Sequence, residues 1–230
     1  MEKFAFIGGY EKADLLLYIA KIFALLNKKI IIMDTTLLQK TRYIIPTMVS
    51  TRQYVTTYED IDIAVGFESI AKLKEFQGLK PTEDLKYDMA LIDIDTARAY
   101  KEFEIKPADK HFFVTSFDLY SLKKGLSVFA QNVDTVNVTK VLFTKDMLGE
   151  EDQYLNFLSK KFKIRWNSEI IFFPFDQGDQ NVIYANQRLS KIRIRGLSMQ
   201  YMDSLIFICE ELSKLGQGEI KKALRTMEKN

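Results

Sequence analysis

Two glycines and a lysine near the start of the chain have the spacing of a phosphate-binding site. Gly8, Gly9 and Lys12 stand between a short apolar run and a long helical pattern, in the stretch FAFIGGYEKADLLLY. A glycine-rich loop that opens a helix binds phosphate, because backbone N–H groups and the helix dipole converge on the anion and the lysine reaches its outer oxygens. The spacing therefore predicts a nucleotide-binding loop.

Two carboxylates in the same loop oppose that chemistry. Glu11 stands where a phosphate-binding loop has a glycine before its lysine, and Asp14 adds a second acid in the first turn of the expected helix. Ala13 replaces the hydroxyl residue that normally ligates Mg²⁺. Acids at a helix N-terminus stabilise the helix by about 0.3–1 kcal/mol but repel a triphosphate. We therefore predict a degenerate loop without a bound cofactor, in which Glu11 or Asp14 mimics the anion; weak binding of ATP or ADP is the alternative.

Further acids follow the predicted strands. Asp34 ends the run IIIMD, Asp93 ends YDMALID, and Pro174 and Asp176 belong to FFPFD. Because the carboxyl ends of parallel strands meet at one edge of a sheet, we expect these residues beside the loop. Together with the loop residues they form the predicted nucleotide site, which we take to be vestigial. We expect Asp93 to pair with Lys12 rather than to hold a metal with Asp95.

The residue types of other catalytic sites are nearly missing from the sequence. The only histidine, His111, opens a predicted strand and is expected at the surface, and the only cysteine, Cys209, lies on the apolar face of a predicted helix. A single histidine leaves little material for metal sites or Ser-His-Asp triads. We therefore predict no catalytic residue and no metal ligand. One cysteine excludes an intrachain disulfide and is typical of a reducing compartment.

Short apolar runs alternate with helical patterns along the whole chain. Strands are expected at about 4–9, 28–35, 60–67, 87–95, 111–116, 136–144 and 169–175, and long helices at about 12–27 and 198–215. Alternating strands and helices predict an α/β fold, in which a mostly parallel twisted sheet has helices on both faces in three layers. No linker-like or repetitive segment interrupts the pattern, so we expect one domain over 1–230.

This order of elements and motifs resembles the MinD/ParA group of P-loop ATPases, including its divergent TadZ/CpaE branch. The family's loop reads K-G-G-x-G-K-[ST]-[ST], and here Ile7 replaces the signature lysine that reaches the partner's nucleotide in a dimer. The family's D-x-D motif is reduced to Asp34 followed by two threonines, whereas PFD at Pro174–Asp176 matches the turn that borders the base. The resemblance implies a P-loop fold around a site short of the groups that phosphoryl transfer needs.

The resemblance also implies a function. It suggests a non-catalytic adaptor, acting as a homodimer, that binds protein partners and positions or assembles a membrane-associated apparatus such as a pilus, secretion or conjugation machine. We expect a cytoplasmic protein that is recruited to the inner face of the membrane only through partners, because the N-terminus has no apolar run typical of a signal peptide and no run is long enough to cross a bilayer. The alternative from the enzyme class is a weak ATP-binding switch ATPase.

A basic cluster raises the second alternative, a ParA-like DNA partition protein. Arg188, Lys191, Arg193 and Arg195 lie close together, and an extended backbone would put the last three on one side. The chain has 33 basic and 31 acidic residues, for a net charge of +2. DNA-binding domains carry a clear positive excess. We therefore do not expect a nucleic-acid partner, and a solvated edge is the favoured interpretation.

Two further segments are open to more than one interpretation. The tail at about 217–230 has an amphipathic helical pattern with basic residues around it, and we expect it to dock on its own domain or a partner rather than on a membrane. The segment 37–58 is rich in tyrosine and β-branched residues and poor in acids. It is expected to form either a protein-contact surface or a covered hairpin or irregular loop.

Overall fold

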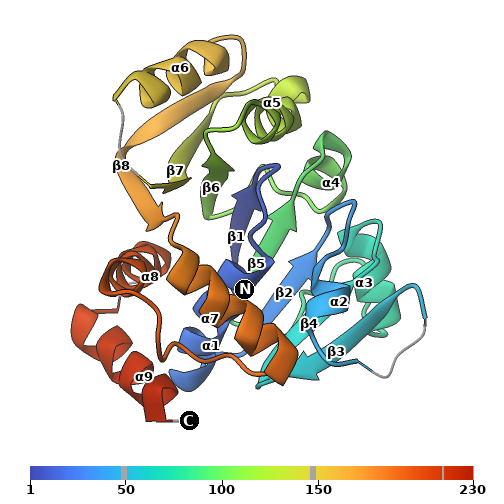
Figure 1. Ribbon diagram of the computed structural model, residues 1–230. Helices are drawn as coiled ribbons and strands as arrows, with labels where there is room; N and C mark the ends of the chain where they lie inside the picture. Colours follow the sequence, from blue (N-terminus) through green and yellow to red (C-terminus); the bar gives the residue numbers. More distant parts are fainter. Residues whose placement is uncertain (48–50, 146–148, 214, 230) are drawn as a thin grey trace.

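The computed structural model describes residues 1–47, 51–145, 149–213 and 215–229. In this part of the chain, eight strands form one sheet in the order β3-β4-β2-β5-β1-β6-β7-β8 (Figure 1). All neighbouring strands pair in parallel except β3 and β4. The strands are β1 (Glu2–Ile7), β2 (Ile30–Asp34), β3 (Tyr54–Tyr58), β4 (Ile61–Val65), β5 (Met89–Ile94), β6 (Lys110–Ser116), β7 (Val136–Thr144) and β8 (Ile164–Pro174).

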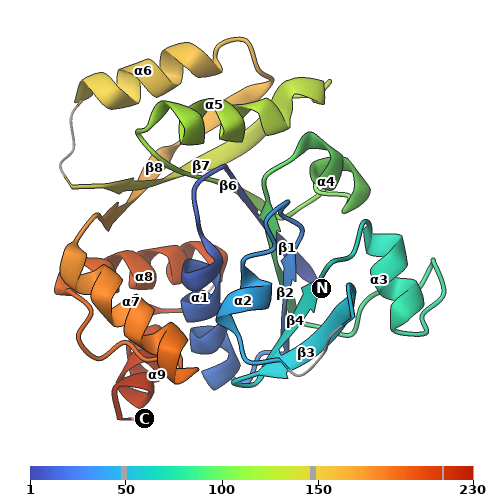
Figure 2. The ribbon, with the colours of Figure 1, turned by 45° about the vertical axis from the view of Figure 1, so that its right-hand side comes forward.

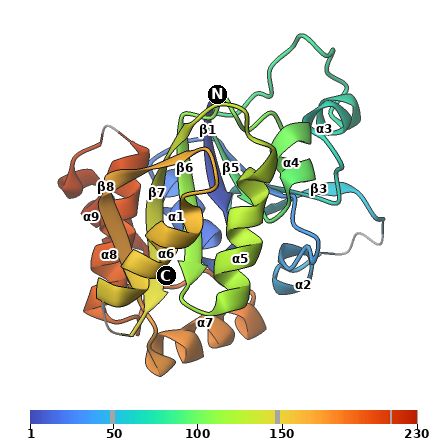
Figure 3. The same ribbon diagram turned by 90° about the horizontal axis from the view of Figure 1, so that it is seen from above.

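Helices cover both faces of the sheet, as Figure 3 shows most directly, with α8 and α9 on one side and α4 and α5 on the other. This arrangement confirms the predicted α/β fold of three layers. The helices are α1 (Ala13–Leu25), α2 (Thr41–Ile44), α3 (Ile70–Phe76), α4 (Ala97–Glu102), α5 (Leu119–Ser127), the 3₁₀ helix η1 (Val128–Gln131), α6 (Gly149–Ser159), α7 (Gln177–Leu189), α8 (Met199–Leu212) and α9 (Gln217–Lys229).

The central strands β2 and β5 are apolar except for one acid each, because helices shield both of their faces. Every residue of β2 and β5 is buried, including the acids Asp34 and Asp93 at or near their carboxyl ends. Parallel strands covered on both sides read as continuous apolar runs rather than as alternating ones. The same property puts any polar side chain of these strands into a dry environment, so each must find a partner within the protein.

A hairpin replaces part of the expected loop before the third predicted strand. β3 pairs antiparallel with β4 through a turn at Glu59 and Asp60, which both have positive φ, at 51° and 67°. Two central residues of positive φ are the mark of the hairpin turns that match strand twist. The interpretation of 37–58 as a covered hairpin is thus confirmed for its last five residues. Residues 48–50 of that segment lie outside the described residues.

The boundaries of two other elements differ from the prediction. β8 begins at Ile164, five residues earlier than expected, because a register shift opposite Val138 and Lys140 lets its polar first half continue the pairing with β7. The last predicted helix ends at Leu212, and a separate helix, α9, follows at Gln217. Residue 214 between them lies outside the described part.

The C-terminal tail folds back onto its own domain. α9 buries Ile220, Ala223, Leu224 and Met227 and contacts α1 and α8 (Figure 1). The expected docking of this helix is therefore confirmed, and its apolar face is not free for a membrane. No helix in the described parts of the chain is long and apolar enough to span a bilayer.

Candidate functional site

The predicted phosphate loop connects β1 to α1 at the carboxyl edge of the sheet. Gly8 lies so close to β6 that a Cβ atom built on it would be 2.0 Å from the carbonyl oxygen of Val114. Any other residue would force the loop away from the sheet, which explains this glycine on packing grounds alone. A Cβ on Gly9 would lie 2.8 and 3.0 Å from Cγ and Cβ of Lys124, close to the backbone of α5, so this glycine is also tightly packed.

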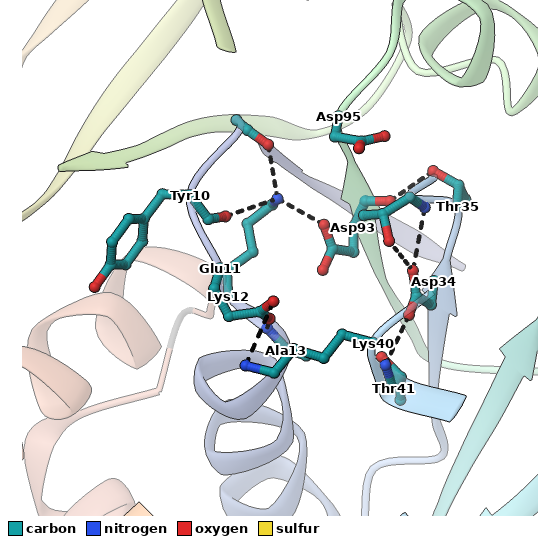
Figure 4. A network of polar contacts seen from close by, with 12 residues as sticks. Tyr10, Glu11, Lys12, Ala13, Asp34, Thr35, Lys40, Thr41, Asp93 and Asp95 are labelled. Carbon is teal, nitrogen blue, oxygen red and sulfur yellow. Dashed lines mark hydrogen bonds and ion pairs between the residues drawn. The ribbon is translucent and has the colours of Figure 1, made fainter. Parts of the chain in front are cut away.

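Lys12 does not point into open space but folds back into its own loop (Figure 4). Its Nζ lies 2.7 Å from Oδ1 of Asp93 and donates to the carbonyl oxygens of Gly8 and Tyr10, at 3.0 and 3.4 Å. An ammonium group has three donors, and all three are used within the chain. Lys12 is 3% exposed. The cation that would contact a phosphate is thus already paired and buried.

Asp93 reaches Lys12 because of the strand order. β5 lies next to β1, with Asp93 opposite Phe6, so its side chain projects beneath the loop that follows β1. Burial raises the pKa of Asp93 to about 7; the charge of Lys12 opposes this rise and the nearby Asp34 adds to it. The pair is therefore a dry, mutually dependent ion pair rather than a solvated one.

Glu11 occupies the helix N-terminus that would otherwise receive an anion. Its Oε1 accepts a hydrogen bond of 2.8 Å from the backbone N–H of Ala13, the first residue of α1 (Figure 4). Its other oxygen lies 3.4 Å from Nζ of Lys40, a residue of the segment before α2. A carboxylate in this position satisfies a free N–H of the first turn and suits the positive end of the helix dipole.

The carboxylate of Asp14 does not lie on the start of α1 but contacts α7. Its two oxygens accept hydrogen bonds of 2.9 and 3.0 Å from Nε2 of Gln187 on α7, and Nζ of Lys40 is 3.8 Å away. Burial raises the pKa of Asp14, against the effects of Gln187 and Lys40. Of the two acids expected to mimic an anion, Glu11 is the one whose carboxylate lies on the backbone at the start of α1.

The side chain of Asp34 accepts hydrogen bonds from the chain that follows it. Its Oδ1 accepts from the backbone and the hydroxyl of Thr36, at 3.1 and 2.6 Å, and its Oδ2 accepts from the N–H of Thr41 at 3.0 Å. Asp95 similarly accepts from the N–H of Leu37, at 3.2 Å. These acids fix the segment between β2 and α2. This role of Asp34 was not predicted, although an aspartate often accepts from the backbone two residues further on, as it does here from Thr36.

Pro174 and Asp176 lie beside the loop but do not join Lys12 and Asp93. Asp176 caps α7 by accepting from the N–H groups of Gly178 and Asp179, at 2.7 and 3.1 Å. Pro174 lines a cavity of about 180 Å³ on the side of the loop that faces α7. A second cavity of about 170 Å³ borders the loop itself; its lining residues are Gly8, Gly9, Tyr10, Glu11, Lys12, Thr36, Leu38, Lys40, Asp93 and Asp95.

The predicted basic cluster is separate from this site. It lies at the end of α7 and in the extended chain leading to α8, where Ile192 and Ile194 are buried and Lys191 and Arg195 are exposed. Arg188 is exposed and Arg193 half-buried. Nζ of Lys191 is 3.9 Å from Glu59. The expected alternation is present, but none of these four basic side chains lines either cavity at the loop.

The prediction for His111 was wrong, whereas that for Cys209 is confirmed. His111 is buried, with Nε2 3.1 Å from the carbonyl oxygen of Ile105 and 3.4 Å from the hydroxyl of Tyr100. It is covered because α4 and the turn after it fold over the start of β6. Burial lowers the pKa of His111. Cys209 is fully buried, and burial raises the pKa of its thiol far above the range in which thiols react.

These residues do not fit a magnesium-bound nucleotide. Lys12 pairs with Asp93 and donates to carbonyl oxygens of its own loop. Glu11 accepts the hydrogen bond of the Ala13 N–H, and Ala13 has no hydroxyl to bind a metal. Among the residues that the structure describes, no group of three or more His, Cys, Asp or Glu is placed to hold a metal ion.

The fold, by contrast, has clear counterparts among solved structures. The sequence matches no protein-family model and no curated protein. The structure is similar to a ParA family ATPase of Chlorobium tepidum TLS (TM-score 0.59, 14% identity, covering 92% of this chain and 98% of the other). It is also similar to the MinC:MinD cell division protein complex of Aquifex aeolicus (0.57, 13%, 94% and 97%) and to a putative plasmid partition protein of Borrelia burgdorferi B31 bound to AMPPNP (0.53, 10%, 93% and 100%). The chain therefore has the MinD/ParA fold over nearly its whole length.

Proposed function

We propose that this protein is a non-catalytic member of the MinD/ParA group, a pseudo-ATPase that works by binding other proteins. The observation that carries the proposal is the buried pair of Lys12 and Asp93. In a working phosphate loop the lysine is free to reach the outer phosphates of the nucleotide. Here the same side chain pairs with Asp93 and donates to carbonyl oxygens of its own loop.

The cost of opening that pair supports the proposal. To contact a phosphate, Lys12 would have to leave Asp93 as an uncompensated buried carboxylate, which typically costs about 3–5 kcal/mol. The phosphate would also meet Glu11, whose carboxylate stands on the helix N-terminus that it needs. Two anions would compete for one helix end. Nucleotide affinity is therefore expected to be low even before the missing magnesium ligand is considered.

Exposed apolar side chains near the loop support a protein-binding role. Leu37, Leu38 and Tyr43 are 70, 81 and 78% exposed and lie on the segment between β2 and β3, and Leu38 borders the cavity at the loop. Apolar patches rimmed by polar residues are typical of interaction surfaces. We call these three residues the switch-segment patch. We propose that it takes part in a homodimer or in the contact with a protein partner.

The proposed setting is a cytoplasmic one beside a membrane-associated apparatus, such as a pilus, secretion or conjugation machine. One similar structure is a MinC:MinD cell division protein complex, which supports a protein partner for this chain. The apolar face of α9 is buried against α1 and α8. Any attachment to a membrane is therefore proposed to pass through a partner rather than through this helix.

A weak ATP-binding switch is the second candidate, and the cavity at the loop favours it. That cavity has a volume of about 170 Å³ and is lined by Gly8, Gly9 and Lys12, the residues that the phosphate loop retains. A nucleotide entering there would have to separate Lys12 from Asp93. This candidate therefore predicts a conformational change that the adaptor does not need.

Calorimetric titration of the purified protein with ATP and ADP, with and without magnesium, separates the two candidates. The adaptor predicts no binding heat and no thermal shift at millimolar nucleotide. Micromolar binding of ATP that depends on magnesium would overturn the adaptor and establish the switch.

A further inference from the structure

A groove between α5 and α6 is an apolar hollow on the described surface. The two helices lie side by side on the same face of the sheet, over β6 and β7 (Figure 2). The groove has a volume of about 400 Å³. Its lining includes Lys123, Leu126 and Ala130 from α5 and η1, and Leu158, Lys161 and Phe162 from the end of α6 and the turn after it.

The floor of the groove is apolar and supported by the core. Leu126 is 2% exposed, and Leu158 and Phe162 are half-buried and pack on the same core cluster. In the last turn of α6, Phe157 is 63% exposed. Large apolar side chains thus line the hollow and continue beside it, which is the arrangement of grooves that accept the apolar face of a helix.

The rim of the groove is positively charged and lacks internal partners. Lys123 stands on one wall and Lys161 on the other, with Lys160 beside it, and no acidic residue lines the hollow. None of these three lysines forms an ion pair with any residue in the described ranges. The ammonium groups of Lys160 and Lys161 instead lie 5.9 and 5.1 Å from phenylalanine ring centres. The charge of the rim is therefore available to a ligand.

We propose that this α5–α6 groove binds an amphipathic helical segment of a protein partner, with carboxylates flanking its apolar residues. The groove residues of α5 and η1 recur at intervals of three and four, so the hollow follows a helix axis and matches apolar side chains at the same spacing on the ligand. Complementary charge selects an acidic partner over a basic one. The inference names the partner chemistry of the proposed adaptor and rests on that function.

The test uses the full-length protein and a phage-displayed library of random 16-residue peptides. Peptides selected on the wild type are expected to be rich in Asp and Glu, with apolar residues three or four apart. Each should bind at least about tenfold more weakly to Lys123→Glu/Lys161→Glu and to Ala130→Trp, which fills the groove from an exposed position. The matched control is Lys222→Glu/Lys229→Glu on the exposed side of α9, which should bind as the wild type does.

Three results would overturn the proposal: no selected peptide, peptides without acidic enrichment, or peptides whose affinity the groove variants leave unchanged. Sedimentation with vesicles of phosphatidylglycerol is run in parallel. Vesicle binding that only the groove variants lose, in the absence of peptide binding, would make the occupant a membrane surface and would also overturn it. Both groove variants are checked for folding by circular dichroism. The groove residues lie outside the phosphate loop, so a negative result in this test contradicts only the proposed groove. Nucleotide binding in calorimetry would instead contradict the adaptor function.

Discussion

At the scale of single residues, the Lys12–Asp93 pair determines what the loop can do. Its two atoms, Nζ of Lys12 and Oδ1 of Asp93, are 2.7 Å apart, and both side chains are nearly buried, with exposures of 2 and 4%. A buried ion pair adds little net stability, because desolvation offsets the attraction, but each partner becomes costly once the other is removed. That asymmetry makes the pair measurable.

Replacing Lys12 by Met should destabilise the protein by about 3–5 kcal/mol at pH 8, because it removes the cation that lowers the pKa of Asp93 and leaves that buried carboxyl without a partner. The double variant Lys12→Met/Asp93→Asn should regain most of this loss, since it removes the unpaired carboxyl. Urea denaturation of the two single variants and the double variant gives the coupling energy directly. A loss below about 1 kcal/mol for Lys12→Met would mean that the lysine is solvated and free to bind phosphate.

Glu11 and Ala13 can be tested by restoring the residues of a working loop. The variant Glu11→Gly/Ala13→Ser removes the competing carboxylate and supplies a hydroxyl for magnesium. We expect it to bind ATP at least about tenfold more tightly than the wild type in calorimetry. The single variants separate the two effects, since Glu11→Gly should raise affinity without magnesium and Ala13→Ser should add the magnesium dependence. An unchanged affinity in the double variant would show that the loop fails for another reason.

The buried histidine predicts a loss of stability in acid. The pKa of His111 is lowered in the fold, whereas an unfolded histidine titrates near 6.5. Below about pH 6.5 the unfolded state therefore binds more protons than the folded state, and stability falls by up to about 1.4 kcal/mol per pH unit until the folded pKa is reached. His111→Gln retains an N–H for the carbonyl of Ile105 and cannot titrate. Thermal unfolding from pH 7.5 to 5 should show a smaller loss for this variant; equal losses would contradict the prediction.

Single residues also show where sequence reasoning stops. Gly8, Gly9 and Lys12 were recognisable because a short motif carries them, and the acid at position 11 is visible in the same motif. The pairing of Lys12 with Asp93 was expected as well, because both residues follow strands whose carboxyl ends meet at one edge of the sheet. The register of β1 beside β5, which sets the distance between the two side chains, is specified by no local pattern. His111 was misplaced for a related reason: its strand position is local, but the chain that covers it comes from α4.

At the scale of elements, the parallel strands were predictable and the edges of the sheet were not. β2 and β5 lie where continuous apolar runs occur, because covered parallel strands need no alternation. β3 reads YVTTY, five residues that favour strands, yet this composition left a hairpin and an irregular loop equally open. The first half of β8 reads IRWNSE, which mixes polar and apolar residues, and it is a strand because it pairs with β7.

Helix α9 gives the prediction at this scale. Leu224 is 4% exposed on the face that packs against α1 and α8, so Leu224→Ala should destabilise the protein by about 2–5 kcal/mol. Arg225→Ala on the exposed side should change stability by less than about 0.5 kcal/mol. Thermal unfolding measures both. If Leu224→Ala leaves stability unchanged but weakens binding to anionic vesicles, the apolar face of α9 binds membranes. The position docked on α1 and α8 would then not be the functional one.

At the scale of the whole molecule, the carboxyl edge of the sheet combines a closed loop with the exposed switch-segment patch of Leu37, Leu38 and Tyr43. A surface that keeps large apolar side chains exposed beside a loop that needs no nucleotide is suited to a permanent contact, because nothing has to bind before the face is complete. The proposed homodimer is therefore expected to form in the absence of ATP, and its strength should depend on apolar burial rather than on magnesium.

Sedimentation equilibrium without nucleotide tests this expectation. The wild type should be dimeric at micromolar concentration, and Leu38→Glu should weaken the dimer at least about tenfold, because the change would bury an unpaired charge in the contact. Phe76→Glu is the matched control, since Phe76 is 54% exposed at the end of α3 and belongs to no part of the patch. A wild type that is monomeric at these concentrations would contradict the constitutive dimer. The patch would then remain exposed in the free protein, and its contact would have to be made with a different chain.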